Sequence, residues 1–326
     1  MALDFAAMFL AEKKRSSTSR KKAERKEAQQ KPSPPSPISS ATIAASKLPT
    51  EAIETLVYVP NFITVAERDA LLSSLDSTAW INLPNRKLQN HGGVPHPSGM
   101  IAERLPPYLQ SFASRVAPAF KDCEQDFEQD FEQEGEQDCS PPDQILVNSY
   151  ERGGGISPHN DGPLYSPTAA VVSVLSAAVL SFHGGEDGEN GETVVARVWL
   201  EPDSLLVFSG EAYSKYKHSI DPVLEDLYDP SLYLNSHAVA SPPLPLSSVP
   251  RSRRVSLTFR RAKEVSRTVE EGEVLPPAVE EERRRRERWW RTAVGDVKRE
   301  PTAAPSSAPP TLSDPPDGTN SRPDIS

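Results

Sequence analysis

Two residues in the segment ISPHNDG, His159 and Asp161, have the types and the spacing to hold a metal ion. On an extended backbone, residues two apart point to the same side, so an imidazole and a carboxylate would face one point. His218, in the segment YSKYKHSI, would complete a set of two histidines and one carboxylate. That facial set suits non-haem Fe(II) and leaves coordination positions open. The His-x-Asp pair alone is a weak signal, because a histidine in a β domain is more often structural.

The segment RVSLTFR, residues 254–260, alternates polar and apolar side chains with the period of a strand. Its apolar face is expected to pack against a core, and its polar face holds Arg254, Ser256, Thr258 and Arg260. Either this polar face is solvated or it binds a dicarboxylate, since arginine can grip a carboxylate through two hydrogen bonds. The Cα atoms of the two arginines would lie about 20 Å apart. We therefore expect them to serve different parts of one site.

An earlier segment, QILVNSY, places Asn148 and Tyr150 on one face of a strand that leads into the His-x-Asp motif. An amide and a phenol can both donate hydrogen bonds to carboxylate oxygens. An Asn-x-Tyr pair by itself does not indicate a function. It becomes informative through the order of motifs along the chain, which is Asn-x-Tyr, His-x-Asp, a distal His, and then Arg-x-Ser-x-Thr-x-Arg.

This order of motifs resembles the AlkB family of Fe(II)- and 2-oxoglutarate-dependent dioxygenases. The resemblance covers about residues 56–262 and implies a double-stranded β-helix, or jelly roll, with the site at its open mouth. It implies that the iron ligands are His159, Asp161 and His218. It further implies that 2-oxoglutarate is held by Asn148, Tyr150, Arg254 and Ser256, with Arg260 as the second arginine of the family.

The same resemblance implies an oxidoreductase that uses Fe(II), 2-oxoglutarate and O2. The cosubstrate would be decarboxylated to succinate and carbon dioxide while a C–H bond of the target is hydroxylated. A hydroxylated N-methyl group would then leave as formaldehyde. Two segments, NRKLQNHGGVPHPSGMIAERLPPYLQ and PHNDGPLYSPTAAVVSVLS, resemble one eukaryotic branch of the family in particular.

The elements that must position these residues are mainly strands. From residue 144 to residue 259, apolar runs rich in β-branched residues alternate with glycine-rich turns, which favours a sandwich, barrel or jelly roll. Helices are expected at VAERDALLSSL, with Thr64 and Glu67 as a capping box, and at LPPYLQSFASRVAPAF. The predicted fold class is therefore mainly β with flanking helices and disordered tails.

Three segments lie outside this pattern. Residues 1–50 are basic and then rich in proline, and we expect a disordered tail that cannot bury a core. The dioxygenase domain is expected over residues 51–265, with a solvated acidic insertion at residues 122–140. Residues 266–326 are expected to form a charged helix and a disordered tail.

The composition of the chain restricts the cellular environments in which the protein is expected. The net charge is −10, and 37% of the residues are apolar, below the average of about 45–50% for globular proteins. No apolar run approaches the roughly 18–20 residues that span a bilayer, so we expect no membrane segment. Cys123 and Cys139 lie in the acidic insertion, which fits a reducing compartment. We expect an intracellular monomer, in the nucleus and the cytoplasm.

Three substrate classes remain open from the residues. These are an alkylated nucleic-acid base, a protein side chain, and a binding role for a relict site. We favour the base, with substrate contacts from His91, His96 and Tyr165. Phosphate contacts are expected from Arg86, Lys87, Lys215 and Lys217. Trp289 and Trp290 could stack on bases, but a packed terminal helix is the favoured interpretation.

Overall fold

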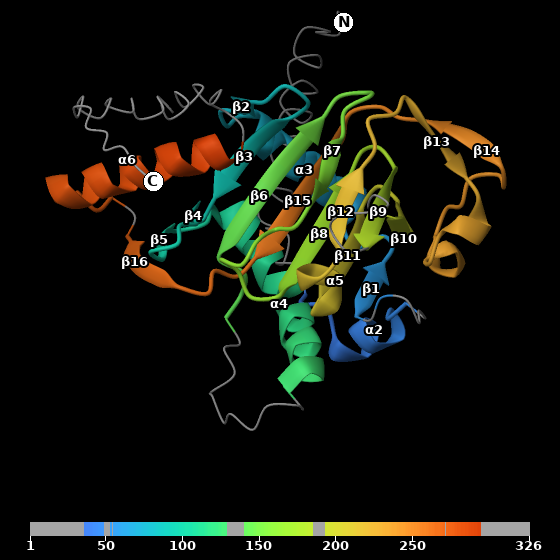
Figure 1. Ribbon diagram of the computed structural model, residues 1–326, viewed down its shortest axis with the longest axis horizontal. Coiled ribbons are helices and arrows are strands. Elements are labelled where there is room, and N and C mark those ends of the chain that lie inside the picture. The colour runs from blue at the N-terminus through green and yellow to red at the C-terminus, as the bar shows by residue number, and fades with distance from the viewer. Residues whose placement is uncertain are drawn as a thin grey trace, which may run out of the picture.

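Two facing β-sheets form the centre of the computed structural model (Figure 1). The structure describes residues 36–48, 53, 55–128, 140–184, 193–270 and 272–294. Within these residues, the larger sheet has the strand order β1 (Leu56–Val59), β11 (Ser204–Ser209), β8 (Thr168–Val174), β15 (Arg254–Arg260), β6 (Gln144–Tyr150), β3 (Lys87–His91) and β2 (Ile81–Asn82). The smaller sheet has the order β10 (Thr193–Leu200), β9 (Ala178–Gly184), β12 (Lys217–Ile220) and β7 (Ile156–His159).

Smaller elements surround the two sheets. The remaining strands form a hairpin of β13 (Glu225–Tyr228) with β14 (Ser247–Pro250), and a small sheet of β16 (Val265–Val269), β5 (Met100–Glu103) and β4 (Gly93–Val94). The α-helices of the described residues are α2 (Ser40–Ala45), α3 (Val65–Asp76), α4 (Pro107–Glu128), α5 (Glu211–Ser214) and α6 (Pro277–Val294). Short 3-10 turns lie at Pro230–Leu232 and Ser236–Ala238.

Two hydrophobic cores hold these layers together. The first lies between the larger sheet and the helices α3 and α4, where Leu75, Val116 and Val147 are fully buried. The second fills the space between the two sheets, where the rings of Phe182 on β9 and Phe208 on β11 lie 5.7 Å apart. Two sheets packed face to face with helices outside are the jelly-roll architecture that the sequence predicts.

The predicted two-faced character of β15 is confirmed. Val255, Leu257 and Phe259 are completely buried in the core on the helix side. The alternate residues, Arg254 and Ser256 among them, therefore point toward the space between the sheets. One strand thus packs the core with one face and supplies polar groups with the other.

The boundary of the ordered N-terminal region differs from the prediction. Ser39 caps α2 by accepting a hydrogen bond from the backbone N–H of Thr42. Ile38 and Ile43 are buried against α3, α4 and the larger sheet. Residues 36–48 therefore contribute to the core, although the surrounding proline and serine residues indicated a tail. Residues 1–35 lie outside the described residues.

Two further boundaries also need correction. Helix α4 continues to Glu128, so residues 122–128 of the acidic insertion are helical and not a loop. Residues 129–139 lie outside the described residues. Residues 266–269, expected to belong to a charged helix, instead belong to the strand β16 (Val265–Val269), which pairs in parallel with β5. A strand of mixed polarity at the edge of a small sheet has no periodic signal that would identify it.

The predicted capping box and terminal helix are both present. The backbone N–H of Thr64 donates to Glu67 Oε2 at 2.7 Å, and the backbone N–H of Glu67 donates to Thr64 Oγ1 at 3.2 Å. Helix α6 lies along β3, β4 and β5, on another side of the molecule from α2 and the lower part of α4 (Figure 1). Among the described residues, no helix is both long and apolar enough to cross a membrane.

Substitution of Gly92 tests how tightly the turn between β3 and β4 packs against the rest of the fold. Its φ is +90°, and a Cβ atom there would collide with the backbone carbonyl of Asp143. We expect Gly92→Ala to destabilise the fold by at least about 3 kcal/mol, the sum of left-handed backbone strain and a steric clash. Gly272→Ala is the matched control, because Gly272 has φ +79° but no described atom within 4 Å of its added Cβ. It should lose only about 1–2 kcal/mol. Denaturant unfolding measures both values, and equal losses would contradict the clash.

Candidate metal and cosubstrate site

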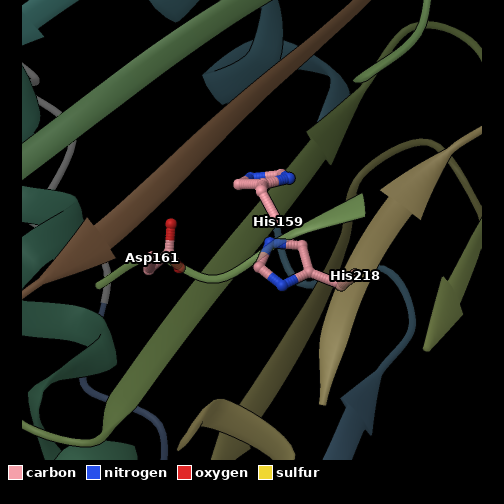
Figure 2. Close-up of side chains that lie close together, drawn as sticks. All are labelled: His159, Asp161 and His218. Atoms are coloured by element: carbon pink, nitrogen blue, oxygen red, sulfur yellow. The ribbon is translucent and has the colours of Figure 1, made fainter. Parts of the chain in front are cut away.

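The three predicted metal ligands meet between the two sheets. His159 ends β7, Asp161 follows two residues later, and His218 lies on β12 directly opposite His159 in the strand register. The two imidazole rings are 4.4 Å apart, and one candidate ligand atom from each of the three residues lies within 4.8 Å of the other two. Figure 2 shows the two rings and the carboxylate around a common space. Chain segments that are distant in sequence thus form the facial set.

The surroundings of the two histidines favour metal binding. His159 Nδ1 lies 2.9 Å from the carbonyl oxygen of Ser157. Because a carbonyl only accepts, Nδ1 must carry the proton, which leaves Nε2 free as a ligand. Burial, with His159 nearby, lowers the pKa of His218 to about 4, and burial also lowers the pKa of His159. Both rings are therefore neutral at pH 7, the form that binds metals.

Asp161 presents one satisfied and one unsatisfied oxygen. Burial alone would raise the pKa of Asp161, but Arg260 and the two histidines lower it below its ordinary value. Arg260 Nη1 donates to Asp161 Oδ1 at 2.9 Å, and both side chains are only 7% exposed. Asp161 Oδ2 is buried and has no hydrogen-bond partner among the described residues. A buried carboxylate oxygen without a partner is rare, and a divalent cation beside the two histidines would satisfy it.

The turn that carries Asp161 is fixed by α5. Tyr213 Oη donates to the carbonyl oxygen of Gly162 at 2.9 Å, and Gly162 has a φ of +95°. Only glycine adopts this backbone conformation at little cost. The carboxylate therefore leaves a turn that is anchored to the body of the fold.

A cavity of about 490 Å³ opens beside the three ligands. It is lined by all the residues predicted for the metal and the cosubstrate, which are Asn148, Tyr150, His159, Asp161, His218, Arg254, Ser256 and Arg260. A somewhat larger cleft of about 560 Å³ lies between β5, β16 and α6. We place the site in the smaller cavity, because the candidate metal ligands lie there.

Arg254 offers the cavity an unused cationic group. Its Nη2 donates to Ser173 Oγ at 2.9 Å, and its guanidinium lies 5.7 Å from the ring of Tyr150. Its Nε and Nη1 are buried without a partner among the described residues. Burial lowers the pKa of Arg254 to about 10. A buried arginine lacking a carboxylate fits a site for an anionic ligand. Arg260 pairs with Asp161 instead, so the two arginines serve different parts of the cavity, as the strand spacing predicts.

The structure adds polar groups that sequence reasoning missed. Arg260 Nε donates to Gln144 Oε1 at 3.0 Å, and Gln144 Nε2 donates to Asn90 Oδ1 at 2.6 Å. Asn90 in turn donates to the carbonyl oxygen of Gly93 at 2.7 Å. A hydrogen-bonded chain therefore runs from the β3–β4 turn to the metal ligand Asp161. Gln144 shares the face of Asn148 and Tyr150 on β6, and that period of two was the available signal.

Arg86 has a different role from the one predicted. It was expected to contact phosphates, but its Nε donates to Asn148 Oδ1 at 3.0 Å inside the cavity. It therefore orients a predicted cosubstrate contact. The sequence could not distinguish these two roles, because an arginine in a charged loop has the same sequence context whether its side chain faces solvent or a cavity.

The three predicted substrate residues are placed differently from one another. Tyr165 is buried in the cavity wall, with the Arg260 guanidinium 4.4 Å from its ring. His91 does not line the cavity. Its side chain lies on the face of β3 that points away from the cavity, where it forms a 3.1 Å hydrogen bond with Gln89 on the same face. Burial lowers the pKa of His91 to about 4. His96 lies beside the cavity, with its ring 5.0 Å from that of Trp289.

The comparisons with known proteins agree with this geometry. Residues 55–260 match the family model of the 2OG-Fe(II) oxygenase superfamily. The chain is 33% identical to "Probable RNA/DNA demethylase ALKBH6" of Danio rerio over 229 residues, which cover 67% of this chain and 89% of that protein. It is 26% identical over 232 residues to "Alkylated DNA repair protein ALKBH8 homolog" of Arabidopsis thaliana, covering 65% of this chain and 59% of the relative.

Among solved structures, that of OsALKBH1 aligns with a TM-score of 0.41 and 17% identity, covering 63% of this chain and 96% of the other. The region matched by the family model contains the facial set, the residues predicted to bind the cosubstrate, and both sheets. The likeness to the zebrafish protein also agrees with the eukaryotic branch that the two sequence segments resemble. The chain therefore belongs to the AlkB family of the 2OG-Fe(II) oxygenase superfamily and is an Fe(II)- and 2-oxoglutarate-dependent dioxygenase.

Proposed function

We propose that this dioxygenase removes alkyl groups from the nitrogen atoms of nucleic-acid bases by oxidation. The observation that carries the proposal is one cavity in which the facial set, Arg254 with two unpartnered nitrogens, and the aromatic wall at Tyr165 lie together. The names of two relatives, "Probable RNA/DNA demethylase ALKBH6" and "Alkylated DNA repair protein ALKBH8 homolog", support the same substrate class. The nuclear and cytoplasmic location and the monomeric state stay predictions.

The chain's own residues prepare the reaction. His159, Asp161 and His218 would hold Fe(II), and Arg254 with Tyr150 would hold the distal carboxylate of 2-oxoglutarate. When bound, the metal with its two cosubstrates supplies an oxidation in which 2-oxoglutarate becomes succinate and carbon dioxide and one C–H bond of the alkyl group becomes C–OH. The hydroxyalkyl group on nitrogen then leaves as an aldehyde. Arg260 keeps Asp161 ionised and oriented, so that the carboxylate is ready to bind the metal.

Removing a metal ligand tests the iron site. We expect His159→Ala to lower the affinity for Fe(II) and the turnover by at least about 100-fold, since even changes behind the ligands cost about 10–100-fold. Isothermal titration with Fe(II) under anaerobic conditions measures the affinity, and thermal unfolding checks the fold. His237→Ala is the control, because His237 is exposed and lies outside the facial set. Iron binding that survives in His159→Ala would refute the assignment.

Removing the unpartnered cation tests the cosubstrate site. Leaving one charge of a buried pair unmatched costs about 3–5 kcal/mol, and about 1.4 kcal/mol is a factor of ten. Arg254→Ala should therefore raise the KM for 2-oxoglutarate at least about 100-fold, measured by succinate formation. Arg253→Ala is the matched control, since Arg253 pairs with Asp76 at the surface, 2.8 Å away. An unchanged KM in Arg254→Ala would place the cosubstrate elsewhere.

Salt dependence tests the nucleic-acid substrate. Lys87 follows the cavity residue Arg86, and Lys215 follows α5. Each makes only a long ion pair, Lys87 with Glu151 at 3.9 Å and Lys215 with Glu211 at 3.5 Å, and their side chains are 48% and 60% exposed. If they contact phosphates, each contact contributes about 0.7 to the slope of log affinity against log salt for a single strand. The double variant Lys87→Gln/Lys215→Gln should therefore bind a single-stranded oligonucleotide more weakly, with a slope shallower by about 1.4. Fluorescence anisotropy across a salt series measures this slope.

Arg253→Gln provides the control for charge, because it removes one positive charge beside Asp76 at the end of α3. Its salt slope should equal that of the unmodified protein. Formaldehyde release from N-methylated oligonucleotides establishes the reaction. Turnover with a methylated peptide and none with oligonucleotides would transfer the proposal to a protein hydroxylase or demethylase.

A further inference from the structure

Helix α6 begins after the end of the region that matches the family model, which spans residues 55–260. It nevertheless forms part of the wall of the reaction cavity. Four of its residues line that cavity together with the metal ligands, and these are Trp289, Trp290, Ala293 and Val294. The C-terminal half of α6 therefore lies over the site, while its N-terminal half contacts the small sheet of β4, β5 and β16.

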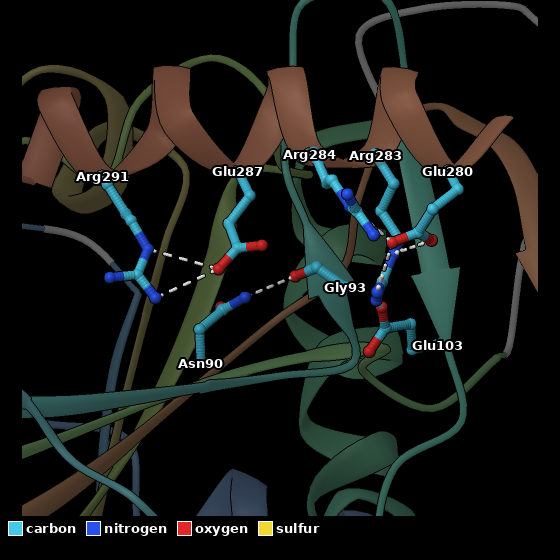
Figure 3. Close-up of polar contacts among 8 residues, drawn as sticks. All are labelled: Asn90, Gly93, Glu103, Glu280, Arg283, Arg284, Glu287 and Arg291. Carbon is cyan, nitrogen blue, oxygen red and sulfur yellow. Dashed lines mark hydrogen bonds and ion pairs between the residues drawn. The ribbon is translucent and has the colours of Figure 1, made fainter. Parts of the chain in front are cut away.

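Ion pairs and hydrogen bonds fix this placement. Arg286 is buried, and its Nη1 donates to the carbonyl oxygen of Gly99 at 2.5 Å and to Ser266 Oγ at 2.9 Å. Arg283 pairs with Glu103 on β5 at 2.6 Å, as Figure 3 shows. Trp290 is buried beside these contacts. The helix is therefore anchored by its own side chains to β5, to β16 and to the turn directly before β5.

Trp289 differs from its neighbour because it remains accessible. Its side chain is 42% exposed, although it lines the cavity. The ring of His96 meets it edge to face, with centroids 5.0 Å apart and an interplanar angle of 73°. A large apolar ring that is held from one side and open on another is a suitable platform for a planar ligand.

The charges of α6 favour a stacking role for this helix over a purely electrostatic one. Most of its arginines are engaged by glutamates of the same helix. Arg284 pairs with Glu280 at 2.9 Å, Arg285 with Glu282 at 2.7 Å, and Arg291 with Glu287 at 3.1 Å. Paired surface charges attract phosphates less than free ones. The ring of Trp289 is therefore the distinctive group that α6 offers at the cavity.

We propose that Trp289 is a specificity-determining residue whose ring stacks on the alkylated base as the base enters the cavity, with His96 holding the ring in place. This inference rests on the proposed function and names the group that would recognise its substrate. Because stacking acts on the base and not on phosphates, its contribution should be insensitive to salt. The charge contacts at Lys87 and Lys215 should behave in the opposite way.

The test compares Trp289→Ala with Trp289→Phe, using single-stranded oligonucleotides that contain one N-methylated base. Formaldehyde release gives kcat and KM separately. We expect Trp289→Ala to raise the KM for the oligonucleotide about tenfold or more, the loss that removing one stacked ring produces. The increase should persist between about 50 and 200 mM salt. Trp289→Phe, which keeps a ring, should stay within about threefold of the unmodified protein.

Leu244→Ala is the control for loss of an exposed apolar side chain, because Leu244 is exposed and does not line the cavity. Thermal unfolding of all variants checks the fold. An unchanged KM in Trp289→Ala, or equal losses in the alanine and phenylalanine variants, would overturn the stacking role and leave the proposed function standing. An unmodified protein that releases no formaldehyde from any N-methylated oligonucleotide would overturn both together.

Discussion

The buried ion pair between Arg260 and Asp161 joins the two sheets at the point where the chemistry takes place. Arg260 comes from β15 of the larger sheet, and Asp161 follows β7 of the smaller one. A buried pair contributes little unless further hydrogen bonds satisfy its remaining donors. Arg260 meets this condition through Gln144 and the ring of Tyr165. The position of the carboxylate is therefore set before any metal binds, because one oxygen is used by the arginine and the other is left for the ion.

Arg254, the second arginine of β15, places a further positive charge in the cavity. Arg254 lies on the same face of the same strand, but no described carboxylate neutralises the two nitrogens that it leaves free. An uncompensated cation in a buried site is costly. A dicarboxylate that binds there removes this cost, and any ligand that binds only the folded chain also stabilises it. The fold thus separates two tasks, with one arginine orienting a metal ligand and the other reserving a site for an anion.

The sequence predicts some parts of this site from local periodicity and others, His218 above all, only through the resemblance in the order of motifs. His159 and Asp161 are two residues apart, and Arg254 and Arg260 share one face of a strand, so backbone geometry alone places them. Gln144, Arg86 and His91 were missed or misplaced because their roles depend on pairing between distant strands. The register of β3 against β6 decides that Arg86 meets Asn148 and that His91 faces away from the cavity. Similarly, α2 and β16 have weak local patterns and are fixed by what they pack against.

Helix α6 shows how selection can be added to a chemistry that the fold already provides. Its charge-rich sequence indicates a charged terminal helix with one packed face, and the structure agrees, because several arginines pair with glutamates of the same helix while Arg286 and Trp290 are buried. Two anchoring contacts bring Trp289 to the cavity, since Arg283 attaches the helix to Glu103 at the end of β5 and Arg286 attaches it to Gly99, directly before β5. The candidate metal ligands and Arg254, the residue proposed to bind the cosubstrate, lie on the two sheets or directly after β7, within the region that matches the family model. The accessible ring of Trp289 lies outside that region, on a helix that lines the same cavity but contributes none of the three metal ligands. A fold that holds the reactive groups rigidly can therefore change its substrate by changing what is packed over its mouth.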